Sequence, residues 1–492
     1  TLIRSRRQRQ MCIRDRAIVC YISWFSPLGA SHSARRWRGV NSVGYNYEDN
    51  KAGGMSNFPL PLAVEMPPTP VEIGSEEYYE LERECARETQ LLMKSSGFDI
   101  AAFDMLPMPE FDSQKELSID NCPLGRFQVF LTWLEEAERT GLKIAMMPDV
   151  MNKSGDYPKG RVLNTNEWLN VLNKALDYAQ DYTSLWRVDN KPVIIHFGTD
   201  QYYSNGKCGP VGGAASPDFG WREVLAKLRK SRDIYFIADI RPHEKMNAWD
   251  KIADAAHIFA PASPRQFLCE YQRVCSRQLE IPLIWTISPG YISWSKSQPA
   301  YIQPDFSRIH ESYLSAMEAG AQSVYVLTWN DFNENTDIVP SNYKADCLLR
   351  IFKFYNEWFK TNKMPDLDND TMFLSYPVRI PKSVMHHVPV KWERLVTGGG
   401  FYTAPPYQPK VFYWANVTKK TTINLGGGQS VTLPGPGLWI GDLGLAEPGK
   451  IQVEVNGRIV SLPDIEQVDD DSGKYGRLDY RYTDITKLLD MQ

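Results

Sequence analysis

The chain of 492 residues lacks the patterns that mark several common classes of protein. It contains no run of eighteen apolar residues, so the sequence predicts no transmembrane helix. No glycine-rich phosphate loop follows the first predicted strand, which disfavours a dinucleotide-binding fold. The eight cysteines include no CxxC pair and do not amount to a disulfide framework. We therefore expect buried free thiols, or one or two bridges if the protein is exported.

An excess of charge of one sign is also lacking. Lys and Arg number 55 against 59 Asp and Glu, and no region beyond the N-terminus is strongly basic, which argues against nucleic acid as a partner. The first sixteen residues hold six arginines and fit either a basic arm that binds anions or a non-native extension. We favour the extension, because MCIRDR resembles a translated library-adapter sequence. Residues 1–16 are therefore left out of the fold prediction.

From residue 17 to about 364, short apolar runs alternate with longer amphipathic ones. The predicted strands are residues 17–25, 98–105, 143–150, 192–200, 234–240, 255–262, 281–291 and 322–330. Each is followed by a predicted helix or a long crossover, a pattern typical of a parallel sheet that is buried on both faces. Eight such units favour a (β/α)8 TIM barrel over an open sheet. The crossover at residues 26–74 is rich in Gly, Pro, Ser and Asn, and a loop of that length is usually functional or disordered.

After a linker at residues 362–371, the pattern changes to period-two runs that are separated by GGG, PGPG and EPG turns. Residues 373–492 therefore predict a second domain, a small antiparallel β sandwich, in which VNGR forms a type I′ hairpin. Trp414 and Trp439 in this domain are candidate sugar platforms, although core packing is the simpler expectation. The predicted fold class is thus α/β, a (β/α)8 TIM barrel with a C-terminal all-β sandwich-like domain.

In such a barrel, the chemistry lies at the C-terminal ends of the strands. Carboxylates, one histidine and several aromatic side chains occupy these positions in the sequence. They are Trp24, Asp104, Asp149, His196, Asp239, Tyr291, Trp294, Trp329, Asn330, Asp331 and Glu334. Because an aromatic ring packs well on the C–H face of a sugar, this combination predicts a carbohydrate site.

Each of these residues also has a structural explanation. Asp104, Asp149 and Asp239 can cap the loops or helices that follow them, and His196 can be a core histidine with satisfied hydrogen bonds. Trp24 and Trp294 can pack the top of the barrel. The final carboxylates can cap the last helix, but two carboxylates beside a Trp and an Asn exceed what a cap needs.

A divalent-metal site is an alternative explanation for four of these residues, Asp104, Asp149, His196 and Asp239. However, the first strand has no HxH pattern, and only one of the 7 histidines lies at a strand end. This disfavours a two-metal hydrolase, so we expect no metal and no cofactor. Ser288 lacks the GxSxG elbow of a serine hydrolase.

The segment LTWNDFNENTDIVPS resembles the motif that follows the last barrel strand in glycoside hydrolase family 71, the endo-1,3-α-glucanases, where Trp-Asn-Asp-aromatic-x-Glu occurs. It is also similar to family 99, the endo-α-mannosidases, and its relatives, which place Trp-Asn-Glu-aromatic-x-Glu there, often before Ile/Leu-x-Pro. FDIAAFDM, IAMMPDV, PVIIHFGT, ISPGYISW and KVFYWANV resemble other segments of family 71. The resemblance covers most of residues 17–460.

The resemblance implies that Asp331 and Glu334 are the catalytic pair of an α-glycoside hydrolase, and we expect Glu334 to be the general acid and Asp331 the base. Similarity to family 71 implies inversion at the anomeric carbon, while similarity to the mannosidases implies retention assisted by the sugar 2-hydroxyl. The motif departs from family 71, since Asn333-Glu334-Asn335-Thr336 stands where Gly-Glu-Ser-His is usual. The following Thr-Asp-Ile-Val-Pro-Ser is closer to the mannosidases, which leaves the substrate open.

Three hypotheses follow: an endo-acting hydrolase of α-1,3-glucan, an α-mannan endo-hydrolase on the same scaffold, and a sugar-binding barrel without catalysis. We expect a polysaccharide or oligosaccharide as the partner, with no nucleic acid and no membrane, and a secreted or periplasmic location. The sequence does not predict the oligomeric state.

Overall fold

The structure is a computed structural model. It describes residues 16–23, 57, 60, 64, 75–105, 127–148, 165–197, 221–240, 249–260, 265–292, 301–302, 304–332, 334–366, 369–381, 408–468 and 479–492.

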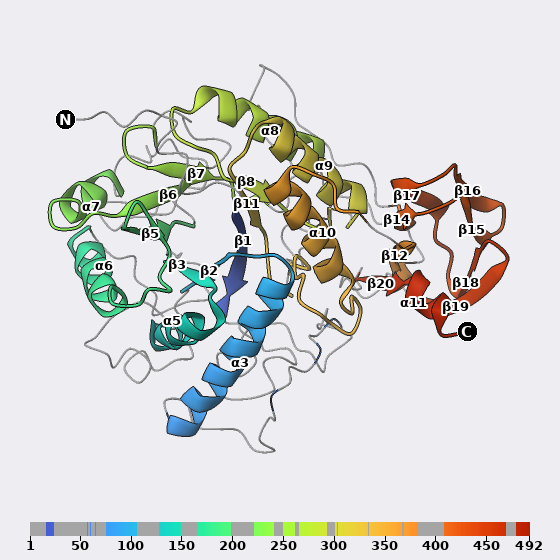
Figure 1. The fold of residues 1–492 in the computed structure, drawn as a ribbon, viewed down its shortest axis with the longest axis horizontal. Coiled ribbons are helices and arrows are strands. Elements are labelled where there is room, and N and C mark those ends of the chain that lie inside the picture. The colour runs from blue at the N-terminus through green and yellow to red at the C-terminus, as the bar shows by residue number, and fades with distance from the viewer. Residues whose placement is uncertain are drawn as a thin grey trace.

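Eight parallel strands within the described residues form the centre of the larger part of the molecule, and they coincide with the eight predicted strands (Figure 1). They are β1 (Arg16–Ile22), β2 (Ile100–Asp104), β3 (Lys143–Met147), β5 (Lys191–Ile195), β6 (Tyr235–Asp239), β7 (Ala255–His257), β8 (Trp285–Ile287) and β11 (Ser323–Val326). Their order is β7-β6-β5-β3-β2-β1-β11-β8. The strand β1 begins at Arg16, which pairs with Ser323, so the last residue of the predicted extension takes part in the sheet.

The sheet closes on itself through the segment that precedes β8. The N–H of Ala256 donates to the carbonyl of Pro282 at 2.9 Å, and the carbonyl of Ala256 accepts the N–H of Ile284 at 2.8 Å. Ala256 and Leu283 also form a parallel bridge. The eight strands therefore form the predicted (β/α)8 TIM barrel, and their residues are almost all buried because the sheet is covered on both faces.

Among the described residues, seven helices surround this barrel (Figure 1). They are α3 (Glu76–Ser95), α5 (Phe127–Thr140), α6 (Thr165–Ala179), α7 (Trp221–Leu228), α8 (Arg265–Gln278), α9 (Phe306–Glu318) and α10 (Cys347–Thr361). The local sequence sets their limits, as α3 illustrates. Its cap residue Ser75 accepts the N–H of Tyr78 at 3.1 Å, and two glutamates in the first turn suit the positive end of the helix dipole. The helix ends before Gly97, which has a φ of +79° and lies so close to Asn356 of α10 that an added Cβ would approach its Cβ to 3.0 Å.

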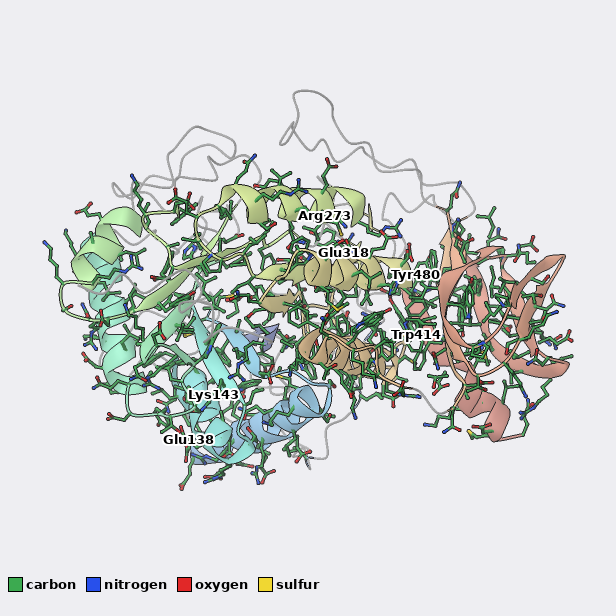
Figure 2. The ribbon with its side chains drawn as sticks, turned by 45° about the horizontal axis from the view of Figure 1, so that its top comes forward. Glu138, Lys143, Arg273, Glu318, Trp414 and Tyr480 are labelled. Carbon is green, nitrogen blue, oxygen red and sulfur yellow. The ribbon has the colours of Figure 1, made fainter. Side chains whose placement is uncertain are left out.

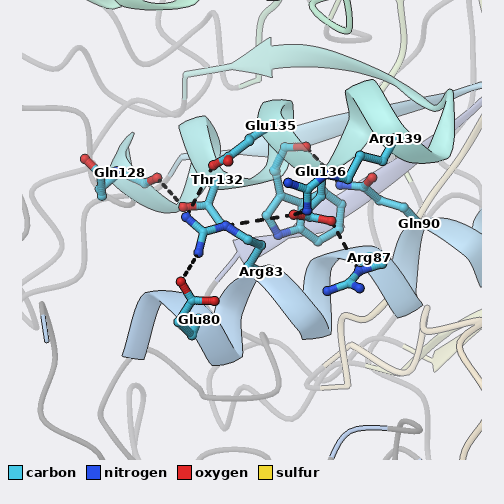
Figure 3. A network of polar contacts seen from close by, with 10 residues as sticks. Glu80, Arg83, Arg87, Gln90, Gln128, Thr132, Glu135, Glu136 and Arg139 are labelled. Atoms are coloured by element: carbon cyan, nitrogen blue, oxygen red, sulfur yellow. Dashed lines mark hydrogen bonds and ion pairs between the residues drawn. The ribbon is translucent and has the colours of Figure 1, made fainter. Parts of the chain in front are cut away.

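A buried carboxylate joins α3 to α5 on the outside of the barrel (Figure 3). The side chain of Glu136 in α5 has no exposed surface, and Arg83, Arg87 and Arg139 lie around it at N–O distances of 3.8, 3.3 and 2.8 Å. Two further glutamates pair with Arg83 in turn. Because three arginines balance three glutamates, one carboxylate can be buried without an uncompensated charge. The network thereby fixes α3 against α5.

Beyond the barrel, the chain forms two further sheets, with strand orders β17-β14-β12-β20 and β13-β19-β18-β15-β16. The strands are β12 (Thr371–Pro377), β13 (Arg379–Pro381), β14 (Lys410–Val417), β15 (Thr421–Gly426), β16 (Gln429–Leu433), β17 (Gly437–Leu445), β18 (Gly449–Val455), β19 (Arg458–Val468) and β20 (Tyr480–Asp484), and the short helix α11 (Ile485–Asp490) follows β20. Leu374 and Tyr413 of the first sheet share one apolar cluster with Val453 and Val460 of the second, so the sheets pack face to face as a sandwich.

The predicted hairpin at VNGR is present between β18 and β19. Val455 pairs with Arg458, and the two residues between them, Asn456 and Gly457, have φ angles of 50° and 88°. Positive φ at both central positions is what a type I′ turn requires, which confirms the prediction. The pairing of the second sheet is not wholly antiparallel as expected, because β13 runs parallel to β19.

The four-stranded sheet rests against the barrel helices with the face that does not meet the other sheet. Trp414 of β14 is 2% exposed, lies edge-on to Phe354 of α10 at a centroid distance of 5.3 Å, and donates its indole N–H to the Tyr355 hydroxyl at 3.1 Å. Figure 2 shows Trp414 and Tyr480 at this boundary between barrel and sandwich. Core packing, the simpler expectation, therefore accounts for Trp414, while the half-buried Trp439 packs against the interior of the sandwich.

No helix in the described part of the chain is both long and apolar enough to cross a membrane. The cysteines that the structure describes are all buried thiols, as expected: Cys20, Cys85, Cys269, Cys275 and Cys347.

Candidate active site

The last barrel strand, β11, leads into a closed loop at residues 328–339, which carries both predicted catalytic carboxylates. The N–H of Thr328 donates to the carbonyl of Thr336 at 3.1 Å, and the two threonine hydroxyls lie 2.9 Å apart. One residue further along, the carbonyl of Trp329 accepts the N–H of Ile338 at 3.0 Å. The base of the 328–339 loop is thus fixed by hydrogen bonds between its two ends.

Both the backbone N–H and the carboxylate of Asp331 form hydrogen bonds within this loop. Its N–H donates to the hydroxyl of Thr328 at 2.9 Å, and its Oδ1 accepts the N–H of Glu334 at 3.2 Å. The three-residue spacing therefore places one carboxylate directly beside the residue that carries the other. The alternative in which these residues cap the last helix is excluded, because α10 begins only at Cys347, after Asp346.

Glu334 carries a carboxyl group with a raised pKa. Burial raises its pKa to about 7, although the Tyr291 hydroxyl, which donates to Oε1 at 3.0 Å, acts to lower it. Tyr291 follows β8 and opens the short strand β9 (Tyr291–Ile292), which pairs with β10 (Tyr301–Ile302). A carboxyl group with a pKa near neutrality keeps its proton in the pH range where an acid catalyst is needed.

Two of the predicted aspartates influence the pKa of the same buried hydroxyl, that of Tyr325. Asp104 ends β2 and is 1% exposed, and Asp239 ends β6 and is fully buried. Burial and then the Cys20 thiol raise the pKa of Tyr325 in β11, and the carboxylates of Asp104 and Asp239 add to this rise. The hydroxyl of Tyr325 donates to the sulfur of Met147 at the end of β3, at 3.2 Å. Strand ends that are far apart in the sequence thus converge as predicted, and Asp239 also holds the loop after β7 by accepting the N–H of a residue there.

His196 lies directly after β5 and is fully buried. Its carbonyl accepts a hydrogen bond of 2.7 Å from Nε2 of His257, the last residue of β7, and this bond requires the proton of His257 to be on Nε2. The ring of His196 packs near Phe236 at a centroid distance of 6.0 Å, and that of His257 lies edge-on to Tyr325 at 5.2 Å. The role of His196 in substrate binding stays a prediction.

Trp329 and Asn330, both predicted to bind substrate, are buried in structural positions. Trp329 is 1% exposed and lies edge-on to Phe98 at 6.4 Å, in the layer between the sheet and the helices. The Asn330 amide accepts the N–H of Ile22 at 2.8 Å and donates to the carbonyl of Ile22 at 3.0 Å. Its side chain therefore continues the pairing of β1 beyond the end of β11, which favours a role in holding the loop.

Three predicted site residues, Trp24, Asp149 and Trp294, lie outside the described residues. Conversely, three residues outside the predicted set interact with predicted ones: Thr328 bonds to Asp331, Tyr325 is influenced by Asp104 and Asp239, and His257 bonds to the carbonyl of His196. The signal for Tyr325 was its place in a strand whose alternate residues face the barrel interior. Within the described residues, no group of three or more His, Cys, Asp or Glu side chains is placed to hold a metal ion.

The chain matches no protein-family model, and no curated protein matches its sequence. Among solved structures, two of the GH99 endo-α-mannosidase from Bacteroides thetaiotaomicron are similar, with TM-scores of 0.47 and 0.46 and 14% identity, over 70% of this chain and 98% of that chain. The endo-β-1,4-mannanase from Thermotoga petrophila has a TM-score of 0.41 and 10% identity, over 78% of this chain and 95% of its own. With TM-scores below 0.5 and identities of at most 14%, these likenesses assign neither a family nor a substrate to the chain.

Proposed function

We propose that the protein is an endo-acting glycoside hydrolase that cleaves α-glycosidic bonds in a polysaccharide, with α-1,3-glucan as the first candidate substrate. The observation that carries the proposal is the bonded series Asp331, Glu334 and Tyr291 at the mouth of a TIM barrel, in which one carboxyl group has a pKa of about 7. The resemblance of the 328–339 loop to the catalytic motif of family 71 supports the same reaction.

In this mechanism, Glu334 donates its proton to the glycosidic oxygen as the bond to the sugar breaks, which lets the leaving group depart as an alcohol. Asp331 takes the proton of the nucleophile, which is water in the inverting reaction or the neighbouring sugar hydroxyl in the retaining one. Its Oδ1 accepts the N–H of Glu334, which holds the carboxylate of the base next to the residue that carries the acid. The raised pKa of Glu334 is the reason for assigning the acid role to this residue and the base role to Asp331.

A second candidate is an α-mannan endo-hydrolase on the same scaffold, which the Thr336–Ser341 segment favours. The two candidates predict different outcomes when α-1,3-glucan and α-mannan are offered separately at equal mass. We expect oligosaccharides of mixed length from α-1,3-glucan, since an endo enzyme cuts within the chain, and little product from α-mannan. Products from α-mannan alone would replace the first candidate with the second, and single sugars as the only early product would contradict endo action.

The rate of hydrolysis is expected to fall as the pH rises through about 7, because Glu334 must be protonated to act as the acid. Tyr291→Phe removes a hydrogen bond that stabilises the carboxylate, so the pKa of Glu334 rises and this limb of the profile moves up by about one pH unit. Tyr182→Phe, after α6 at the opposite end of the barrel, is the matched control and leaves the profile in place. A pH–rate profile of Tyr291→Phe that coincides with the wild type would show that this tyrosine does not act on the acid.

A further inference from the structure

A buried ion pair lies just beyond the catalytic loop. Asp337 is fully buried and Lys344 is 5% exposed, and Nζ of Lys344 lies 2.7 Å from Oδ1 of Asp337. The same ammonium donates to the carbonyl of Asp337 at 2.6 Å, and the Asn57 amide donates to Oδ2 at 2.9 Å. Burial raises the pKa of Asp337, and Lys344 and Asn57 oppose that rise. The carboxylate is therefore held from two sides.

Three distant parts of the chain meet around this pair. Asn57 belongs to the long crossover after β1, and the N–H of Leu60 from the same crossover donates to the carbonyl of Pro340 at 2.8 Å. The sandwich joins from the other side, since the N–H of Tyr482 in β20 donates to the carbonyl of Tyr343 at 2.7 Å. Burial raises the pKa of the Tyr482 hydroxyl in β20, and the charge of Asp337 adds to that rise. Barrel, crossover and sandwich thus share one junction.

A short series of hydrogen bonds leads from this junction to the two carboxylates. Asp337 follows Thr336, which bonds to Thr328 through its carbonyl and its hydroxyl. The hydroxyl of Thr328 accepts the N–H of Asp331, whose carboxylate accepts the N–H of Glu334. A displacement of Asp337 is therefore expected to displace the reacting groups.

Stability alone does not account for such a pair. Taking two charges out of water carries a desolvation cost, and apolar side chains of the same volume often stabilise a protein as well or better. What an ion pair adds is a fixed direction and distance between its two charged groups, here Nζ of Lys344 and Oδ1 of Asp337. At this junction, the fixed distance sets the position of the 328–339 loop.

We propose that Asp337 and Lys344 are positioning residues that anchor the catalytic loop to the crossover and the sandwich, so that Asp331 and Glu334 keep their reactive geometry. The inference rests on the proposed function. It gives the sandwich a role in catalysis, because β20 helps to form the junction that holds the loop.

The chain offers a matched control for this pair. Lys360 of α10 lies 2.7 Å from Oδ2 of Asp99 and donates to the carbonyl of Gly97 at 2.6 Å, the same combination of contacts as Lys344 makes. Asp99 precedes β2 and also accepts the N–H of Ala17. The Lys360 pair therefore lies at the N-terminal end of the barrel, away from the catalytic loop.

The test compares Lys344→Met with Lys360→Met in the full chain. Lys344→Met is expected to lower kcat by about 10- to 100-fold with little change in KM, because misplaced catalytic groups weaken the transition state more than substrate binding. Hydrogen–deuterium exchange of the peptide that spans residues 328–341 is expected to become faster. In Lys360→Met, kcat stays within about twofold of the wild type, and exchange of the 328–341 peptide is unchanged. We expect this even if the melting temperature of Lys360→Met falls as far as that of Lys344→Met.

Asp337→Asn keeps the size of the side chain and serves as the second variant if Lys344→Met does not fold. We expect a lower kcat and faster exchange of the 328–341 peptide in this variant too, both to a smaller extent. Unchanged exchange of the 328–341 peptide in a folded variant at this pair overturns the proposal, and so does a kcat equal to that of Lys360→Met. The exchange measurement needs no substrate, so it decides whether the pair anchors the loop even if the wild type cleaves no glycoside. Failure of the proposed function is thus seen separately, in the wild-type assay.

Discussion

Glu334→Gln is expected to lower kcat for glycoside hydrolysis by about 10²- to 10⁴-fold, the usual contribution of a general acid, and Asp331→Asn is expected to have an effect of similar size. Gln cannot supply the proton that Glu334 carries near neutral pH, and Asn cannot accept the proton of the nucleophile. Initial rates of reducing-end release from the wild type and the two variants, measured at equal protein concentration, check both expectations.

Both substitutions preserve the hydrogen bonds that hold the loop. A Gln oxygen can accept from Tyr291, and an Asn oxygen can accept the N–H of residue 334, so the melting temperatures should stay close to that of the wild type. Glu318→Gln is a suitable control, because this glutamate pairs with Arg273 on the surface helices and is largely exposed (Figure 2). A folded Glu334→Gln or Asp331→Asn variant that hydrolyses at the wild-type rate would contradict the assignment of the pair.

Trp414→Ala is expected to destabilise the protein by about 3–5 kcal/mol, the usual cost of deleting a buried Trp side chain. The indole fills the contact between β14 and α10, and its loss also leaves the Tyr355 hydroxyl without the N–H that it accepts. Chemical or thermal unfolding that is followed by circular dichroism measures the change.

Trp439→Ala is the paired control, because Trp439 lies on β17 opposite Ala415 of β14 and is only half-buried. Its loss should therefore cost less than that of Trp414. If Trp414→Ala left the unfolding curve unchanged but abolished binding to an insoluble polysaccharide, Trp414 would be a sugar platform and the packing role would be wrong.

The barrel was predictable because the sequence patterns that indicate it lie within short segments of the chain. Each of the eight strands is a short apolar run followed by a helical pattern, and eight such units on a parallel sheet have few other solutions. The selection of Asp331 and Glu334 as the candidate pair followed from the same rule, since residues at the C-terminal ends of such strands meet on one face. The hairpin at VNGR was predictable for a similar reason, because Asn-Gly specifies its own turn.

What the sequence did not reveal depends on contacts between distant residues. Asn330 was expected to face substrate, but its amide pairs with the backbone of Ile22, which lies 308 residues away. Asn57 bonds to Asp337 across 280 residues, and nothing in either local pattern indicates that contact. The burial of Trp329 against Phe98 was not visible in the sequence either, because the 328–339 loop follows the end of β11 and the direction of its side chains cannot be derived from the alternation of a strand.

Hydrolysis in water labelled with heavy oxygen separates a hydrolase from a barrel that only binds sugars. We expect the wild type to convert α-1,3-glucan oligosaccharides into shorter products whose new reducing ends carry the label, and Glu334→Gln to bind the same oligosaccharides without forming labelled products. Wild-type protein that binds these and other α-linked oligosaccharides but never forms a labelled product would show that the barrel is not a hydrolase.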